Sequence, residues 1–234
     1  MSKPHEERLG EAIQRAQEEI ARACARSHRA IDRVRLLAAV KNVAPERIRE
    51  AYALGLRLFG ENRVQERALK RAALEDLEGA EWHLLGPLQS NKAGAALDLF
   101  DCLETVDSLE LARRLDRLAG ERERAKVPVL IEVNIAAEAQ KHGIAPDQAP
   151  ELAAALASLA HLELRGLMAV PPAATDPEAS RRHFAALASL AGGLGVAELS
   201  MGMSTDYTVA IEEGATIVRL GSALFGARPA PVVS

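Results

Sequence analysis

This sequence predicts an α/β protein that folds as a single (β/α)8 barrel, the TIM-barrel architecture. Three observations support this prediction. Eight short apolar runs alternate with helical patterns along the chain. The length of 234 residues is typical of a one-domain barrel. No GxGxxG motif follows the first apolar run, so the dinucleotide-binding fingerprint of the alternative, an open doubly wound sheet, is missing. We therefore expect one domain over residues 1–234.

The first element is an extra N-terminal helix ahead of the barrel. Over residues 5–26, apolar residues recur at steps of three and four, with charged residues elsewhere. The apolar positions are Leu9, Ile13, Ala16, Ile20 and Ala23. This spacing predicts an amphipathic helix.

The strands and helices of the barrel follow in order. The expected strands are residues 34–41, 56–62, 81–86, 101–108, 127–134, 162–170, 198–204 and 217–225. Helical patterns occupy residues 45–54, 62–79, 109–121 and 146–159, and the alanine-rich tracts near 151–160 and 185–193 keep helical spacing. No linker rich in Pro, Gly or Ser divides the chain, which agrees with one domain.

Composition excludes several functional classes. A formal net charge of -4 argues against a nucleic-acid partner held through its phosphates. Cys24 and Cys102 have neither a CxxC spacing nor a nearby histidine pair, so we expect buried thiols rather than a disulfide framework or a metal site. The N-terminus is charged where a signal peptide is apolar, and no segment is apolar enough to span a bilayer. We expect a cytoplasmic protein without membrane attachment.

Candidate functional residues cluster where the expected strands end. In a barrel of this kind the carboxyl ends of the strands carry the functional groups. The candidates there are Lys41, Asn62, residues 86–91, Asn134, Ser204, Gly221 and Ser222. Their convergence on one rim, rather than any one residue, indicates a ligand site.

Lys41 closes the first apolar run and is the candidate nucleophile. Strand alternation places it on the same face as Leu37 and Ala39. If that face is the barrel interior, desolvation lowers the pKa of the amine and suits it to Schiff-base formation with an aldehyde. The alternative is a solvated lysine that only marks the end of the strand.

Ser204 and the pair Gly221 and Ser222 indicate a phosphate site. Ser204 stands where it could cap a short helix that Gly214 ends, and a helix N-terminus attracts anions. Loops after the seventh and eighth strands are the usual phosphate site of this barrel. Plain capping by Ser204 or Thr205 is the alternative.

Arg219 shares a strand face with Gly221 and, inside a barrel, needs an acceptor for its permanent charge. A ligand ring nitrogen or a buried carboxylate such as Glu132 would serve. We assign no catalytic role to four other basic residues. His83 is expected to be a satisfied core histidine, Lys141 and His142 to be solvated, and Lys92 is left without a role.

Seven segments, taken in order, resemble the pyridoxal phosphate homeostasis protein family. They are LLAAVKN (36–42), FGENRVQE (59–66), WHLLGPLQSNK (82–92), EVNIAAEAQKHGI (132–144), RGLMAVPP (165–172), LSMGMSTDY (199–207) and VRLGSALFGAR (218–228). The resemblance implies an alanine-racemase-like barrel of fold type III that binds pyridoxal 5'-phosphate (PLP). It places the Schiff base on Lys41 and a cofactor-site asparagine at Asn62.

The same resemblance implies roles at the other end of the cofactor. Ser204, Gly221 and Ser222 correspond to phosphate-binding residues, and Arg219 to the arginine beside the pyridine nitrogen. An arginine that is always protonated leaves the ring uncharged and a weaker electron sink. The chain departs from the family where Val40 and Asn42 flank the lysine and where Pro87 follows Gly86.

Two functions remain open. The resemblance implies a carrier that takes part in intracellular PLP and amino-acid homeostasis, with apo PLP-dependent enzymes and free amino acids as partners. The alternative is an amino-acid racemase of fold type III, which needs a second base. We expect the tyrosine-bearing β domain of racemases to be absent, since the sequence ends at Ser234, and Tyr207 is then the remaining candidate because Tyr52 lies in the first crossover helix. We favour a monomeric carrier with no catalytic residue.

Overall fold

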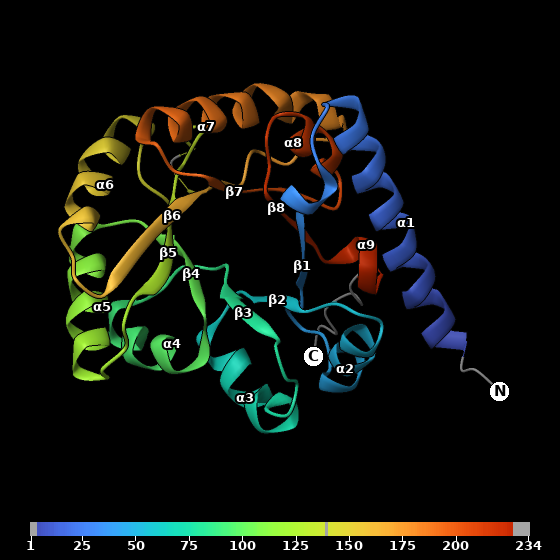
Figure 1. Cartoon of the computed structure of the whole chain (residues 1–234), viewed down its shortest axis with the longest axis horizontal. Coiled ribbons are helices and arrows are strands. Elements are labelled where there is room, and N and C mark those ends of the chain that lie inside the picture. The colour runs from blue at the N-terminus through green and yellow to red at the C-terminus, as the bar shows by residue number, and fades with distance from the viewer. Residues whose placement is uncertain (1–3, 139, 227–234) are drawn as a thin grey trace.

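The structure is a closed barrel of eight parallel strands with helices around it (Figure 1). It is a computed structural model that describes residues 4–138 and 140–226. Neighbouring strands pair in chain order, and β8 closes the barrel against β1. The strands are β1 (Arg35–Ala39), β2 (Leu58–Glu61), β3 (Glu81–Leu84), β4 (Cys102–Val106), β5 (Val127–Glu132), β6 (Leu162–Met168), β7 (Glu198–Met203) and β8 (Ile217–Leu220). The predicted fold is confirmed.

A helix precedes the first strand, others lie between successive strands, and a short one follows the last strand. They are α1 (Pro4–Arg26), α2 (Pro45–Ala53), α3 (Val64–Leu74), α4 (Ala93–Leu99), α5 (Leu109–Glu121), α6 (Ala149–Ala157), α7 (Arg181–Leu194), α8 (Tyr207–Glu212) and α9 (Ser222–Phe225). Short 3₁₀ turns lie at Ile31–Arg33, Ser90–Lys92, Pro146–Gln148 and Pro177–Ser180. None of the described helices is long and apolar enough to cross a membrane.

The last strand is shorter than predicted. Residues 217–225 were expected to be extended, but β8 ends at Leu220, whose partner on β1 is Ala38. The N–H groups of Leu224 and Phe225 then bond to the carbonyl of Gly221, which starts the helical turn α9. Gly221 and Ser222 therefore lie after the strand, with Ser222 opening α9.

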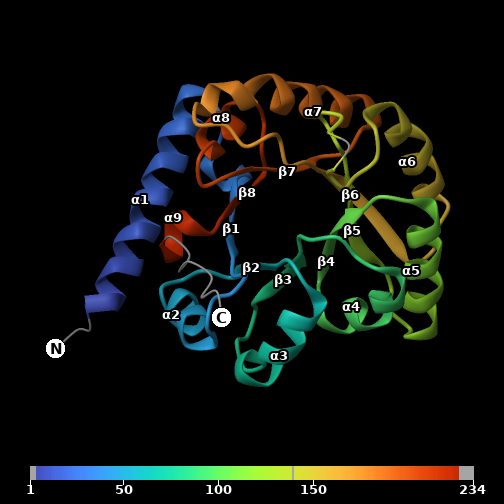
Figure 2. The ribbon, with the colours of Figure 1, turned by 180° about the vertical axis from the view of Figure 1, so that it is seen from behind.

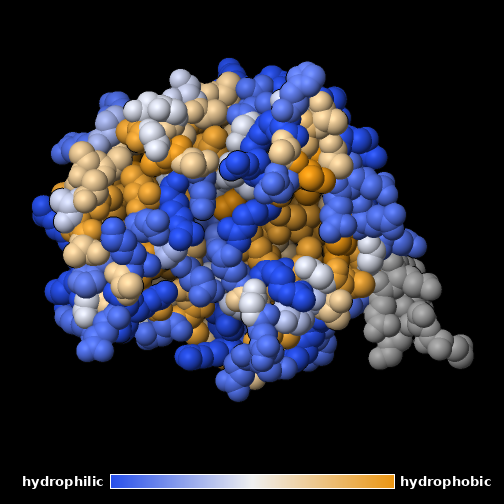
Figure 3. Space-filling view, in the orientation of Figure 1, coloured by the Kyte–Doolittle hydropathy of each residue, from blue (hydrophilic) through white to orange (hydrophobic). Residues whose placement is uncertain are grey.

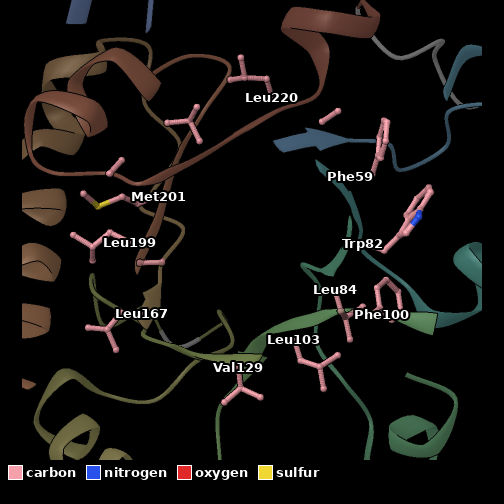
Figure 4. Close-up of a cluster of buried hydrophobic side chains, with 14 of the residues drawn as sticks. Phe59, Trp82, Leu84, Phe100, Leu103, Val129, Leu167, Leu199, Met201 and Leu220 are labelled. Carbon is pink, nitrogen blue, oxygen red and sulfur yellow. The ribbon is translucent and has the colours of Figure 1, made fainter. Parts of the chain in front are cut away.

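The main hydrophobic core lies between the outer face of the barrel and the helices. Figure 4 shows it as a ring of side chains that point outward from successive strands. Among them, Phe59 on β2 and Trp82 on β3 stack with ring centroids 5.2 Å apart. Figure 3 shows hydrophilic side chains over much of one outer face, with hydrophobic ones in recesses between them.

Helix α1 covers the side of the barrel where the chain closes. Figures 1 and 2 both show it along the outside, next to α8 and α9. Its five predicted apolar positions are all buried, which confirms the amphipathic prediction. Cys24 on this helix and Cys102 on β4 are buried free thiols, as expected.

The inside of the barrel contains small apolar clusters. Leu37, Leu58 and Ile217 form one cluster, with Ala39 packed against it. Ala38 and Val40 belong instead to the outer core. Strand alternation therefore runs as the sequence predicts, and the chain that leaves β1 reaches Lys41 at the rim of the barrel.

Candidate functional site

A cavity of about 720 Å³ opens at the carboxyl ends of the first strands. Its size falls within the range of about 300–1,000 Å³ that is usual for small-molecule sites. Its lining comprises Lys41, Asn62, Arg63, Val64, Gln65, Glu66, Leu69, Pro87, Leu88, Gln89, Lys92 and His142. The loops after β1, β2 and β3 thus bring Lys41 and Asn62 to the same cavity, as the strand-end argument predicts.

Lys41 is half-buried in a tight turn directly after β1. The N–H of Val43 donates to the carbonyl of Val40 at 3.0 Å, which closes the turn around Lys41. Asn42 has a φ of 59°. Asparagine adopts this left-handed conformation more readily than most residues, so the geometry of the turn explains why an asparagine suits position 42.

Asn62 is half-buried and is held in place by a close approach of two loops. A Cβ atom at Gly86 would lie 2.1 Å from the carbonyl oxygen of Asn62. Only glycine fits there, so the loop that follows β3 presses against the backbone of Asn62. Pro87 comes next and is exposed at the cavity.

Ser204 is not the helix cap that the sequence predicted. Asp206 is the N-cap of α8, and its carboxylate accepts the Met203 N–H and the Ser180 hydroxyl, each at 2.8 Å. The prediction failed because the aspartate two residues on takes the capping position. Gly214, with a φ of 107°, ends the helix region as expected.

The Ser204 hydroxyl oxygen instead joins the loops after β7 and β8. It accepts the N–H of Gly221 at 3.4 Å and that of Ala223 at 3.2 Å. Both bonds are long, so these donors are weakly engaged. Two weakly engaged backbone N–H groups therefore point at the Ser204 hydroxyl oxygen, and donors of this kind, in the loops after β7 and β8, are suited to an anion.

Ser222 is exposed and lines a separate cavity of about 390 Å³ beside α1 and α2. Its neighbour Gly221 faces the end of β1, because a Cβ atom there would lie 3.4 Å from the carbonyl oxygen of Ala39. The contact between Ser204 and Gly221 thus lies on the β8 side of the Lys41 turn, and the cavity with Asn62 on the β2 side.

Arg219 is 5% exposed and points into the barrel. Its Nη1 donates to the Ser200 hydroxyl at 2.7 Å and its Nη2 to the carbonyl of Ala169 at 2.9 Å. A guanidinium has five N–H groups, so these bonds leave three of them available. Burial lowers the pKa of Arg219, while the charges of Glu104, Asp206 and Glu132 oppose that shift.

Glu132 does not pair directly with Arg219. Its Oε2 atom is buried, and no hydrogen-bond partner for it lies among residues 4–138 and 140–226. Burial, aided by the charge of Asp107, raises the pKa of Glu132 to about 7, with Arg219 opposing. Arg219 thus influences Glu132 through space, by its positive charge, and does not form the direct ion pair that the sequence offered as an alternative.

The partners that hold Arg219 escaped the sequence reasoning. The Ser200 hydroxyl donates to Glu104 Oε2, and Glu104 Oε1 bonds to His83 Nδ1 at 2.5 Å. His83 is 1% exposed and fully paired, which confirms it as a satisfied core histidine. Strand alternation assigns inward positions, but it does not reveal which inward polar groups touch across the barrel.

The loop after β5 differs in part from expectation. His142 is exposed, as expected, and lines the cavity. Lys141 is instead held, since its ammonium lies 2.7 Å from a Glu138 carboxylate oxygen and donates to the carbonyl of Val170 at 3.1 Å. Asn134 closes its own loop through two bonds to the Glu138 backbone.

The tyrosines contact outer elements. The Tyr207 hydroxyl donates to Glu19 on α1, and burial raises its pKa. The Tyr52 hydroxyl donates to the carbonyl of Glu78 at 2.7 Å. Both hydroxyls are committed away from Lys41, so the geometry gives no support to Tyr207 as a second base.

Comparisons with known proteins show similarity over most of the chain. The profile of the family described as alanine racemase, N-terminal domain, matches residues 12–229. Proteins named pyridoxal phosphate homeostasis protein from Aquifex aeolicus and Pseudomonas aeruginosa are 42% and 46% identical. These alignments cover 93% and 83% of this chain, and 97% and 85% of those proteins. PipY of Synechococcus elongatus, solved with PLP bound, superposes with a TM-score of 0.78 at 41% identity, over 88% of this chain and 100% of that one.

Proposed function

This chain belongs to the alanine racemase N-terminal domain family and, within it, to the pyridoxal phosphate homeostasis proteins, and we propose that it binds PLP and holds it for delivery. The observation that carries the proposal is that Lys41, directly after β1, lines the cavity of about 720 Å³, while β1 also pairs with β8, the strand that leads to Gly221 and its contact with Ser204. Its relative PipY has been solved with PLP bound.

The residues present fit the cofactor at each of its ends. PLP supplies an aldehyde that bonds reversibly to a primary amine, and Lys41 provides that amine at the cavity. Ser204, with the N–H groups of Gly221 and Ala223, would hold the phosphate. Asn62 lines the same cavity as Lys41 and would contact the ring side of the ligand.

Arg219 suits the ring nitrogen. It is a permanent cation with N–H groups to spare, so it would donate to that nitrogen and leave it without a proton. An uncharged ring withdraws electrons weakly, which favours storage over carbanion chemistry. The orientation of Arg219 by Ser200 and Ala169 supports this role.

We favour a carrier over a racemase. Racemisation needs a second base on the far face of the substrate carbon, and Tyr207 is bonded to Glu19 on the outer helix α1. The carrier would act as a monomer in the cytoplasm and pass the cofactor to apo-enzymes or to free amino acids. The names of its relatives as homeostasis proteins support this reading.

Absorption spectroscopy tests the proposal. The purified protein with PLP should be yellow, and borohydride should fix the cofactor to one lysine. Lys41→Ala should lose both the visible band and the fixation. Lys126→Ala is the matched control, because Lys126 is exposed before β5 at the opposite end of the barrel. An equal band in Lys41→Ala would refute the assignment.

A further inference from the structure

Two side chains of helix α3 form hydrogen bonds with the backbone on either side of Lys41. On one side the Lys70 ammonium donates to the carbonyl of Val40 at 2.9 Å. On the other, the Asn42 N–H donates to a Glu66 carboxylate oxygen at 3.4 Å. Glu66 and Lys70 are one helical turn apart, so one helix face reaches both peptide groups that flank Lys41.

Lys70 also joins the ends of the first two strands. Its ammonium donates to Glu61 Oε1 at 2.6 Å as well as to Val40. Val40 precedes Lys41, and Glu61 precedes Asn62. The Lys70 side chain is only 12% exposed, and its ammonium group thus links the two loops that line the cavity.

The turn that carries Lys41 needs such support. The last strand-type bond is from the Val40 N–H to Gly60 at 2.9 Å, after which Lys41 and Asn42 lie in the turn. The Val40 carbonyl accepts one bond from Val43, which moves with the turn itself. Lys70 supplies the bond that ties this carbonyl to a separate element.

The ion pair is costly for the fold to maintain. The Glu61 side chain is fully buried, and its Oε2 atom has no hydrogen-bond partner in the part of the chain that the structure describes. Burial of a carboxylate with one oxygen unpaired costs free energy, and a well-packed apolar pair would usually be as stable. The placement of this pair beside Lys41 therefore points to a role at the site.

We propose that Lys70, held by Glu61, is a positioning residue that fixes the backbone of Lys41 so that its amine meets the cofactor aldehyde in a reactive geometry. A small displacement of a reacting amine slows bond formation and weakens covalent binding, because the amine must then be ordered again before it can react. Glu66 contributes the smaller part, since its contact is longer. This inference rests on the proposed function.

The test separates covalent from non-covalent binding in Lys70→Met. Covalent binding is measured from the visible band and the borohydride-fixed fraction in a PLP titration. Non-covalent binding is measured with pyridoxine 5'-phosphate, which carries an alcohol in place of the aldehyde. We expect the covalent affinity to fall roughly tenfold to a hundredfold, as for loss of a charge-assisted hydrogen bond. The affinity for pyridoxine 5'-phosphate should stay as in the wild type.

Three further variants control the result. Arg71→Met removes a neighbouring exposed charge from the same helix and should behave as the wild type. Lys70→Arg keeps charge and donors and should restore covalent binding. If Lys70→Met does not fold, Lys70→Gln keeps one donor and should lose covalent affinity to a smaller extent, again without loss of pyridoxine 5'-phosphate binding.

Two outcomes would overturn the inference. One is covalent binding in Lys70→Met equal to that of Arg71→Met. The other is a parallel loss of both affinities, which would mean that Lys70 only supports the fold. Failure of the proposed function looks different, because the wild-type protein itself would then show no band that depends on Lys41.

Discussion

His83 is a buried cation between two carboxylates. Its Nε2 bonds to Glu81 at 2.7 Å, and its Nδ1 bonds to Glu104. With an acceptor at each ring nitrogen, the doubly protonated imidazole fits best. Burial works against that charge, but the two carboxylates outweigh it and raise the pKa of His83 to about 9. The same pairing lowers the pKa of Glu81 to about 2.

This arrangement predicts a loss of stability in mild alkali. The folded-state pKa of His83 lies above the ordinary value of 6.5, so its contribution is complete below pH 6.5 and is lost as the pH rises through about 9. The full loss is roughly 3 kcal/mol. Urea unfolding at a series of pH values measures it. Glu81→Gln removes one carboxylate and should reduce the slope.

Other groups fall in different pH windows. The pKa values of Glu61 and Glu132 are raised to about 7, so the folded state holds their protons more tightly than the unfolded state, and the resulting stability is lost as the pH rises from about 4.5 to 7. Burial raises the pKa of both thiols, which affects stability only in stronger alkali, above about pH 9; the charge of Glu81 adds to the shift of Cys102 but not to that of Cys24. Identical slopes for the two proteins between pH 7 and 9 would contradict the assignment to His83.

Elements were predictable where their pattern is periodic. All eight strands and the amphipathic α1 follow from the alternation and spacing of apolar residues. The predicted boundaries were wrong where a short-range contact decides them, as at Gly221, whose carbonyl starts α9, and at Asp206, which takes the N-cap position expected for Ser204. Local propensity does not resolve such competition.

The candidate site follows the same division. The rule that strand ends meet at one rim brings Lys41 and Asn62 to one cavity. The links from Lys70 to Val40 and from Ser200 to Glu104 join residues 30 and 96 positions apart. Contacts of that kind depend on how helices and strands pack, so no motif or spacing in the sequence predicts them.

Helix α1 is fastened to the barrel partly through Tyr207. The phenol on α8 donates to Glu19, and Arg26 of α1 lies 2.6 Å from Glu212 at the end of α8. Tyr207→Phe should therefore lower the free energy of unfolding by about 1 kcal/mol, the usual worth of one hydrogen bond. The borohydride-fixed fraction of PLP should not change. Thermal unfolding and the visible band measure the two effects.

The same variant discriminates carrier from racemase. If the wild-type protein racemises alanine or serine with many turnovers per site, and Tyr207→Phe abolishes this, then Tyr207 acts as a base and the carrier proposal is wrong. Glu19→Gln is the matched control, because it keeps an acceptor for the phenol while removing the charge.

At the scale of the whole molecule, a chain of polar contacts crosses the barrel interior. It begins at Arg35, the first residue of β1, which pairs with Glu81 at the start of β3. It continues through His83, Glu104 and Ser200 to Arg219 near the end of β8. Positive and negative groups alternate from Arg35 to Glu104, and the neutral Ser200 hydroxyl links Glu104 to Arg219. This chain connects the base of the barrel to the group proposed to face the cofactor ring.

Glu104 is the point at which this chain serves both fold and site. Glu104→Gln removes the negative charge that pairs with His83 and acts on Arg219 through Ser200, and should cost about 3–5 kcal/mol of stability. The double variant His83→Leu with Glu104→Leu removes both members of the buried pair and should recover most of this stability, because only Arg219, which can still donate to Ser200 and Ala169, then lacks the anion. Its Arg219 would nevertheless lose the anion behind Ser200 that helps to orient it.

PLP affinity then shows whether this series of polar contacts serves the binding site or only the fold. We expect the stable double variant to bind PLP roughly tenfold more weakly, because a charged donor that is no longer held must be ordered on binding. Urea unfolding and PLP titration of the same preparations supply both quantities. Wild-type affinity in the double variant would mean that the buried charges maintain only the barrel, whereas a stable fold with weakened binding would mean that they hold Arg219 for the ring nitrogen.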